Sequence, residues 1–283
     1  MENLTELLEQ FKAESKQQAI RLTAQRSDRI TATSSKFGGL PYLSKNFAYP
    51  TDVNGNPLKL LAQLNFGELP PLADFPTSGI LQFFVLHDYD IGSDWQNQGN
   101  QSHHKVIYHR EIHENDQMTD FPEVKFISPY PPGEEEEWFP FQGEFAVTGE
   151  LAEIFPTFGS VDFDVKFNPF AEKHQIDMKS RETWKTVDTF LSENFNDHHL
   201  IGGFPSFVQG DPRHHKKNLG KYDTLLFQMS SDSWKENWEE TWGKVPIEEE
   251  IAWGDGGIAN FFINRTDLQN LKFDDVLYNW DCG

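Results

Sequence analysis

Short apolar segments bounded by glycine and proline dominate the pattern of the chain. Residues 60–64 and 80–85 are two such segments, and both consist mainly of leucine, phenylalanine and isoleucine. They are too short for helices in a protein core and have the composition of strands that are buried on both faces. Each contains one amide side chain among apolar neighbours. The pattern predicts a mainly β fold.

The same segments recur in the second half of the chain. Three blocks appear twice in the same order, and the matching pairs are residues 37–43 with 201–207, 60–64 with 225–229, and 79–85 with 257–263. Ordered matches of this kind indicate an internal duplication. We expect a β-rich α+β fold in which two internally duplicated β units are related by a pseudo-twofold axis, with a few flanking helices. Gln63 should then superpose on Gln228, and Phe83 on Phe261.

The segments outside the repeats carry mixed signals. Helical spacing of apolar residues over residues 3–24 predicts an N-terminal amphipathic helix, and residues 181–195 predict another, with Ser180 as its N-cap. Strand-like composition marks residues 105–112, 123–128 and 161–167. We therefore expect one domain at 1–283, with an N-terminal helix in 1–33, the first repeat with extra strands in 34–130, a connecting segment and helix in 131–195, and the second repeat in 196–283.

Four motifs together carry a resemblance to a known family. The turn Gly38-Gly39-Leu40-Pro41, the strand Leu61-Ala62-Gln63 and the block at residues 79–84 each have a counterpart in the second copy, whose last block follows Trp253-Gly254-Asp255-Gly256-Gly257. This combination resembles the YwqG-like family of bacterial proteins, whose biochemical role is unassigned, and it covers nearly the whole chain. The resemblance implies a mainly β fold with flanking helices, and it transfers no catalytic residue.

Charge and composition narrow the classes of partner. The 283 residues include 24 basic and 45 acidic side chains, for a net charge of −21, which would repel phosphate backbones, so we expect no nucleic-acid partner. No 18-residue apolar run is present, and the N-terminus lacks the apolar core of a signal peptide, so we expect a cytoplasmic protein without a membrane partner. The one cysteine, Cys282, excludes a disulfide framework and a cysteine-based metal site within the chain. We expect no cofactor.

The amides within the apolar strands are the first candidates for a site. An amide buried without hydrogen-bond partners costs about 1–3 kcal/mol per unsatisfied group, so each must find a partner. They either fasten the backbone of nearby loops or line a polar pocket, in which Trp253 and Asp255 of the adjacent glycine-rich turn would take part. The candidate ligand-binding residues are Gln63, Gln82, Gln228, Asn260, Trp253 and Asp255.

A tryptophan repeat among acidic residues is the second candidate. Three tryptophans recur every four residues and would form one stripe on a helix, either buried against the core or exposed to a partner. An exposed stripe surrounded by glutamates would suit a basic protein. The candidate partner-binding residues are Trp234, Trp238, Glu236, Glu239 and Glu240, with Trp242 completing the stripe.

Catalytic and metal-binding motifs are absent from the sequence. It contains neither an H-E-x-x-H nor a G-x-S-x-G motif, and its adjacent histidine pairs would point to opposite faces of a strand. We expect surface histidines and no metal site. Two functions remain open: a non-enzymatic binding protein for a basic protein partner, which we favour, and a small-ligand binder or enzyme with a pocket at the seam between the two repeats. The oligomeric state is not predicted.

Overall fold

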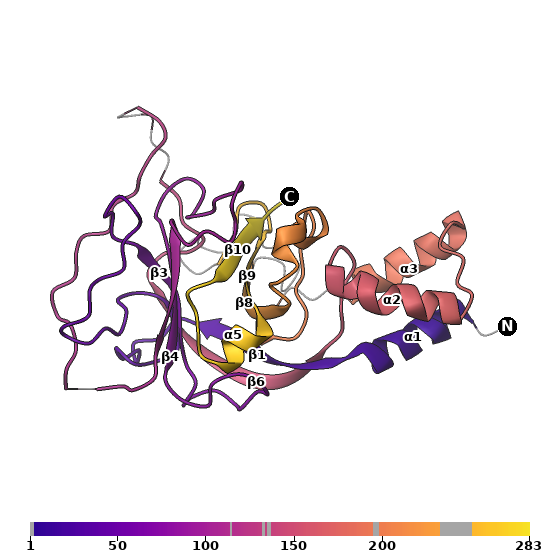
Figure 1. The fold of residues 1–283 in the computed structure, drawn as a ribbon, viewed down its shortest axis with the longest axis horizontal. Coiled ribbons are helices and arrows are strands. Elements are labelled where there is room, and N and C mark those ends of the chain that lie inside the picture. Colours follow the sequence, from indigo (N-terminus) through magenta and orange to yellow (C-terminus); the bar gives the residue numbers. More distant parts are fainter. Residues whose placement is uncertain (1–2, 114, 132–133, 135–136, 195–197, 233–250) are drawn as a thin grey trace.

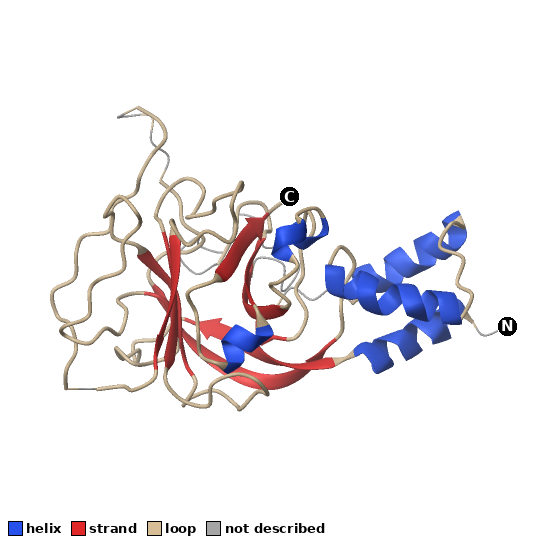
Figure 2. Ribbon diagram, in the orientation of Figure 1, coloured by secondary structure: helices blue, strands red, loops and turns tan. Residues whose placement is uncertain are grey.

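The computed structural model describes residues 3–113, 115–131, 134, 137–194, 198–232 and 251–283. Over these residues the chain forms one ten-stranded antiparallel sheet with a small group of helices at one end (Figures 1 and 2). In chain order the elements are α1 (Leu4–Ser15), β1 (Gln17–Gln25), β2 (Lys36–Gly38), β3 (Lys59–Asn65), β4 (Ile80–Val85), β5 (His104–His109), β6 (Glu144–Ile154), α2 (Val161–Lys173), α3 (Arg181–Glu193), β7 (His199–Gly202), the 3₁₀ turns η1 (Pro212–His214) and η2 (Lys217–Leu219), β8 (Thr224–Ser230), β9 (Ile258–Ile263), α5 (Arg265–Gln269) and β10 (Val276–Asp281).

The strand order of the sheet is symmetric about its centre. It reads β10-β9-β8-β7-β1-β6-β2-β3-β4-β5, so β2 to β5 of the first copy mirror β7 to β10 of the second. The pairing repeats in detail, because Gln63 lies opposite Gln82 in one copy and Gln228 lies opposite Asn260 in the other. Both copies also have a register shift at the same point, between Leu60 and Ala62 in β3 and between Leu225 and Phe227 in β8. The predicted pair of duplicated β units is confirmed.

The two central strands are exchanged between the copies. Strand β1 precedes the first copy in sequence but pairs with β7 of the second, whereas β6 precedes the second copy and pairs with β2 of the first. These pairings make Ile20 equivalent to Phe145, and counting along the strands makes Thr23 equivalent to Thr148. Thr23 and Thr148 are paired with each other, so the pseudo-twofold axis passes between them.

The sheet curls until its two edge strands approach each other. Inside it, the Phe83 ring of β4 lies 4.8 Å from both Phe227 of β8 and Phe261 of β9, so one apolar cluster contains side chains from both copies. At the edges, His104 Nε2 of β5 lies 3.0 Å from the carbonyl oxygen of Val276 in β10. These two residues are equivalent under the duplication, so the contact closes the sheet on the side opposite the central strands.

The helices form a separate layer with its own core. Helices α1, α2 and α3 lie together at the end of the molecule that carries the N-terminus (Figure 1). Phe11 of α1 packs edge-on against Phe163 and Phe167 of α2, with centroid distances of 5.8 and 5.1 Å. The predicted N-cap of α3 is confirmed, because Ser180 Oγ accepts a hydrogen bond from the Thr183 backbone. No helix among the described residues is long and apolar enough to cross a membrane.

Three local predictions are wrong. The helix predicted at 3–24 ends at Ser15, because residues 17–25 pair on both sides with other strands, and this tertiary pairing overrides local periodicity. Residues 161–167 form the start of α2 rather than a strand, since Ser160 caps the helix and its phenylalanines recur at helical spacing. Residues 123–128 form no strand and contribute only the isolated bridge from Ile127 to Asp88. The divisions at 1–33 and 131–195 therefore missed two strands of the sheet.

Closure of the sheet by His104 predicts a pH dependence of stability. Burial lowers the pKa of His104 to about 4, below its usual value near 6.5. Between these two pKa values the unfolded chain binds more protons, so stability is full above pH 6.5 and falls as the pH is lowered toward 4. We expect His104→Gln, which keeps a donor for the Val276 carbonyl, to weaken this dependence by up to about 3 kcal/mol between pH 7 and pH 4.

Denaturant unfolding at a series of pH values measures this effect. The buried His87 and the half-buried His109, whose pKa values burial also lowers to about 4, should leave part of the dependence in place. The exposed His113 provides the matched control, and His113→Gln should leave the profile of the wild type unchanged. Identical profiles for the wild type and His104→Gln would contradict the assignment.

Candidate functional site

In the first copy, two buried amides hold one residue of the loop that follows the Gly-Gly turn. Gln63 Oε1 accepts a hydrogen bond from the Tyr42 backbone nitrogen at 2.8 Å, and Gln82 Nε2 donates one to the Tyr42 carbonyl at 2.6 Å. Gln63 Nε2 also donates to the carbonyls of Ala32 and Ser34. We call the pair Gln63 and Gln82, with its equivalent in the second copy, the amide clamp.

The second copy repeats this arrangement. Gln228 Oε1 accepts from the Ser206 backbone nitrogen at 2.8 Å, and Asn260 Nδ2 donates to the Ser206 carbonyl at 2.9 Å. Ser206 is the residue equivalent to Tyr42. All four clamp amides are buried and bonded to loop backbone, so the structure supports the interpretation that they fasten the loops. None of them is among the residues that line the cavities described below, and a polar pocket at the amides stays a prediction.

The loop that the clamp holds forms one wall of a cavity at a mouth of the curled sheet. The cavity has a volume of about 850 Å³. Lys59 of β3 lies in it and shares a face of the sheet with its cross-strand neighbour Val85, a member of the main core, so the cavity lies at the end of the interior. We call this cavity the Lys59 cavity. Its lining residues are Gly38, Gly39, Lys59, Leu60, the segment 137–143, Ala252 and Gly254.

The Gly-Gly turn brings backbone close to this cavity. Gly38 and Gly39 both have a φ of 69°, a conformation that residues with a side chain rarely adopt. A Cβ atom on Gly38 would lie 2.4 Å from the carbonyl oxygen of Gly143, so that position also has no room for one. The cavity therefore combines contributions from the first copy with Ala252 and Gly254 from the second, which places it at the seam between the repeats.

Lys59 is the cation of the cavity. Its Nζ lies 3.4 Å from His87 Nε2 and 4.0 Å from the centre of the Phe139 ring, and among the residues that the structure describes no carboxylate forms an ion pair with it. Burial lowers the pKa of Lys59, and the charge of Glu137 opposes this effect. Burial, together with the charge of Lys59, lowers the pKa of His87 to about 4, so the imidazole is neutral at pH 7. The ammonium is thus partly desolvated beside a neutral neighbour.

A second cavity, of about 480 Å³, is the symmetry equivalent of the first. Its cation is already paired, because Arg265 Nε donates to Asp74 Oδ2 at 2.8 Å. Thr224 occupies the position of Lys59. The corresponding lining residues are Gly38 with Gly202, Gly39 with Gly203, Lys59 with Thr224, Leu60 with Leu225, Gln142 with Gln17, and Gly143 with Gln18.

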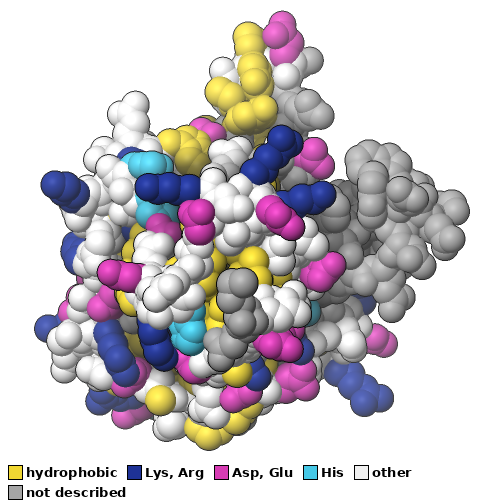
Figure 3. Space-filling view, turned by 90° about the vertical axis from the view of Figure 1, so that its right-hand side faces the viewer, with side chains coloured by type: hydrophobic (Ala, Val, Ile, Leu, Met, Phe, Trp, Pro, Cys, Tyr) yellow, Lys and Arg dark blue, Asp and Glu magenta, His cyan; other side chains and the backbone are white. Residues whose placement is uncertain are grey.

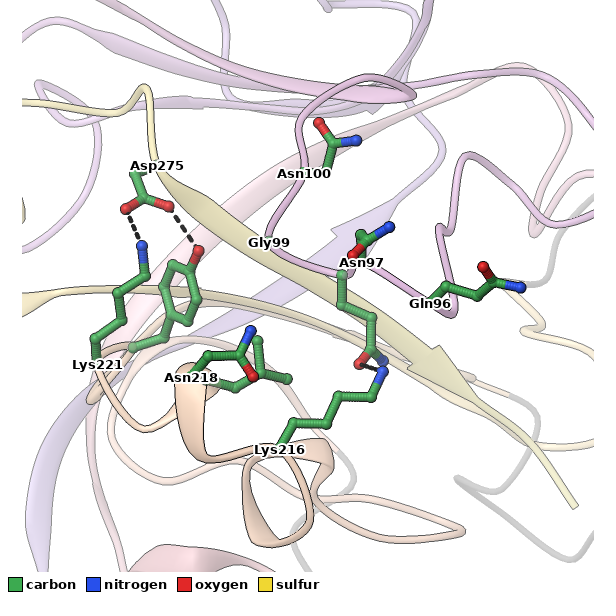
Figure 4. Close-up of a pocket in the computed structure, with 11 residues that line it drawn as sticks. Gln96, Asn97, Gly99, Asn100, Lys216, Asn218, Lys221 and Asp275 are labelled. Carbon is green, nitrogen blue, oxygen red and sulfur yellow. Dashed lines mark hydrogen bonds and ion pairs between the residues drawn. The ribbon is translucent and has the colours of Figure 1, made fainter.

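A third cavity also has its charges satisfied by the chain itself. It has a volume of about 470 Å³ and lies between the loop at residues 96–100 and η2 (Figure 4). Its Lys221 and Tyr222 both donate to Asp275. Its other lysine, Lys216, donates to Gln98 Oε1 at 3.0 Å and to the Trp95 carbonyl at 2.8 Å. The Lys59 cavity differs from both, because its cation contacts an imidazole and an aromatic ring rather than a carboxylate, an amide oxygen or a backbone carbonyl.

The remaining predicted ligand-binding residues lie beside the Lys59 cavity rather than in its lining. Trp253 is fully buried, with its ring centre 5.8 Å from that of Trp280, and only its neighbours Ala252 and Gly254 reach the cavity wall. Asp255 is exposed, and its carbonyl oxygen accepts a hydrogen bond from the backbone of Gly283. Trp253 therefore packs in the core and does not floor the pocket.

The predicted partner-binding residues lie outside the described residues. Trp234, Trp238, Trp242, Glu236, Glu239 and Glu240 all fall within 233–250. On the face of the molecule at the end where α1–α3 lie, acidic and basic side chains are interspersed, with no broad region of one sign (Figure 3). Recognition of a basic protein stays a prediction.

Buried histidines overturn the expectation that the histidines lie on the surface. His87, His104 and His199 are almost fully buried. His87 packs on Phe126 and Phe139 and has one carboxylate, Glu137, near its Nε2, and His199 likewise has one, Asp232. Within the part of the chain that the structure describes, no group of three histidine, cysteine, aspartate or glutamate side chains is arranged to hold a metal ion.

Sequence reasoning missed Lys59, His87 and Glu137. One signal was available: the duplication aligns Lys59 with Thr224, so a charged residue in one copy replaces a neutral one in the other at the start of an apolar strand. Glu137 lies in the acidic run 134–137, which reads as a solvated loop. His87 gave no signal, because its burial depends on the distant ring of Phe139.

One protein family matches the chain over residues 35–282, which include nine of the ten strands described above. The chain belongs to this family, the domain of unknown function DUF1963. No curated protein matches the chain. Both Gly-Gly turns, both amide clamps and the Lys59 cavity lie within the part that matches DUF1963, whereas β1, at the centre of the sheet, lies outside it.

The amide clamp predicts a loss of stability when Gln63 is replaced. Gln63→Leu should leave the Tyr42 nitrogen and the carbonyls of Ala32 and Ser34 without their partner, at about 1–3 kcal/mol for each buried group. We expect the free energy of unfolding to fall by at least about 2 kcal/mol in denaturant titrations. Gln18→Leu, at an exposed position of β1, should change it little. Equal losses for the two variants would refute the role of the clamp.

Proposed function

We propose that the chain binds a small organic anion in the Lys59 cavity. The observation that carries the proposal is the ammonium of Lys59, which is partly desolvated and has a neutral imidazole and an aromatic ring as its contacts. Removing a cation from water is costly unless an opposite charge compensates it. An anion seated in the cavity would provide that charge.

The walls of the cavity favour an organic ligand over a bare inorganic ion. Trp138, Phe139 and Phe141 are among its lining residues, together with Gly38 and Gly39 of the turn. Aromatic walls with a small number of placed polar groups are typical of pockets that bind small molecules. The volume of about 850 Å³ lies within the range of such pockets. We therefore infer a ligand with an anionic group and a flat, largely apolar body.

The net charge of −21 does not oppose this proposal. Exposed charges farther apart than about 8 Å are largely screened at physiological ionic strength, whereas a partly buried pair is screened much less. The affinity for an anion therefore depends mainly on Lys59 and on its nearest acid, Glu137, whose side chain is 66% exposed. Glu137 Oε1 lies 3.6 Å from His87 Nε2 and competes with an incoming anion for this corner of the cavity.

We also propose a finer family assignment, to the YwqG-like group of bacterial proteins. It rests on the paired Gly-Gly-x-Pro turns, the paired glutamines in β3 and β8, and the motif at residues 253–257. Recognition of a basic protein by residues 234–240 stays a separate prediction.

The proposal is tested by identifying what the protein retains from a small-molecule extract of its host cells. The purified chain would be incubated with the extract, washed, and analysed by mass spectrometry for bound compounds. We expect wild type to retain an organic anion and Lys59→Met to lose at least tenfold in affinity for it, because a hydrogen bond to a charged group contributes about 1.5–3 kcal/mol. Glu137→Gln should retain more than wild type, since it removes a competing charge.

Two controls make this result specific. Lys125→Met removes a lysine whose side chain is 73% exposed, and it should retain the same compounds as wild type. Melting temperatures of all variants establish that the fold is intact. Retention of the same anions by Lys59→Met as by wild type would refute the proposal. Recovery of the compound in converted form would identify an enzyme, and recovery unchanged would identify a binding protein.

A further inference from the structure

A second lysine is buried on the other side of the Gly-Gly turn. The cavity beside it has a volume of about 470 Å³ and shares Gly39 and Gly143 with the Lys59 cavity as its wall. We call it the Lys36 cavity. Its lining is mostly apolar and includes Leu40, Met118 and Phe121, with Lys36 and Glu144 as its charged residues.

The ammonium of Lys36 is poorly satisfied for a buried charge. Its side chain is 4% exposed, its Nζ lies 3.4 Å from the Thr31 carbonyl, and the nearest carboxylate oxygen, Glu144 Oε2, lies 4.0 Å away. An ammonium has three hydrogens to donate, and both of these contacts are long. Burial lowers the pKa of Lys36, and the charge of Glu144 only opposes that effect. These long contacts therefore offset only part of the cost of burying the ammonium.

The duplication shows that the fold does not require a cation at this position. Lys36 pairs with Gln63 in the first copy, and Leu200 pairs with Gln228 in the second, so Leu200 is the equivalent residue. Leu200 is fully buried in an apolar cluster. An apolar side chain thus satisfies the same backbone environment, including the neighbouring clamp amide.

The rim of the Lys36 cavity carries an exposed apolar side chain. Leu40, in the turn between the two cavities, is 60% exposed. A large apolar side chain that faces solvent beside a buried cation matches the two parts of an amphipathic anion, since each part of the ligand then meets its complement.

We infer that the Lys36 cavity is a second, separate binding site for an organic monoanion with an apolar body. The anionic group would take the free hydrogens of the Lys36 ammonium, and the body would lie against Leu40, Met118 and Phe121. The inference does not depend on the Lys59 cavity, because the two lysines lie in different cavities, separated by Gly39 and Gly143.

The test uses 8-anilinonaphthalene-1-sulfonate, a fluorescent sulfonate with an apolar body, and 1-anilinonaphthalene, which lacks the sulfonate. Calorimetric and fluorescence titrations would be run on wild type, Lys36→Leu, Lys59→Met and the exposed control Lys125→Met. We expect Lys36→Leu to lose one binding event that Lys59→Met and Lys125→Met retain, and to bind the uncharged compound as wild type does. Leu40→Ser, at an exposed position, should weaken the same event without removing the charge.

Stability measurements separate a binding role from a structural ion pair. If Lys36 serves a ligand, Lys36→Leu should unfold at the same temperature as wild type or higher, because a poorly satisfied buried charge is replaced by an apolar side chain. A melting temperature lower by several degrees would assign Lys36 to a structural pair with Glu144 and overturn the inference. So would sulfonate titrations in which Lys36→Leu and Leu40→Ser both match wild type.

Discussion

Pairing of β1 with β6 and β7 holds the two copies in one sheet. Each of the central strands leaves the copy that it precedes in sequence and completes the other, so the hydrogen bonds of β1 and β6 join the copies along their full length. The register that results puts Thr23 beside Thr148 and, on the far side of the curled sheet, His104 beside the carbonyl of Val276. The two ends of the curled sheet, where the Lys59 cavity and its symmetry equivalent lie, are positioned by this arrangement.

The duplication gives each unusual side chain an internal reference. Where the two copies share a residue type, as at the Gly-Gly turns and the clamp glutamines, the backbone geometry explains the choice. Where they differ, the fold tolerates either residue, and the difference needs another explanation. Lys36 against Leu200 and Lys59 against Thr224 are differences of this second kind. Both place a desolvated ammonium in the first copy, on the two sides of a single turn.

The sequence was sufficient for those parts of the fold that depend on local pattern. The buried strands at 60–64 and 80–85, the duplication and the cap at Ser180 all follow from composition, order and spacing within short segments. Strand β1 was missed because its apolar residues continue the helical spacing of α1, and only pairing with β6 and β7 makes it extended. Helix α2 was missed because each of its phenylalanines, considered alone, favours a strand, although together they recur at helical spacing.

The residues of the candidate sites also differ in whether a local sequence pattern reveals them. The clamp amides were found because a glutamine within an apolar strand must be bonded, and a single strand shows that need. Lys59 and Lys36 are ordinary surface residues in a linear reading, since lysine at the end of a strand is usually solvated. Their desolvation comes from Phe139 and Glu137 in one case and from the loops at 30–32 and 117–121 in the other. Phe139, Glu137 and the loop at 117–121 are far from the lysines in sequence, whereas residues 30–32 lie only a few positions before Lys36.

Exchange of a strand between two equivalent units within one chain is the geometry of a domain-swapped homodimer whose subunits have been joined. In a homodimer both mouths would be identical, so any side chain that suited one ligand would be forced on both. Covalent linkage removes that restriction, because each half can be altered alone. The lysine at one mouth and the paired Arg265 and Asp74 at the other show two halves that have diverged in charge while keeping the same backbone. Asymmetry of this kind is available to a fused pair and not to a homodimer of identical subunits.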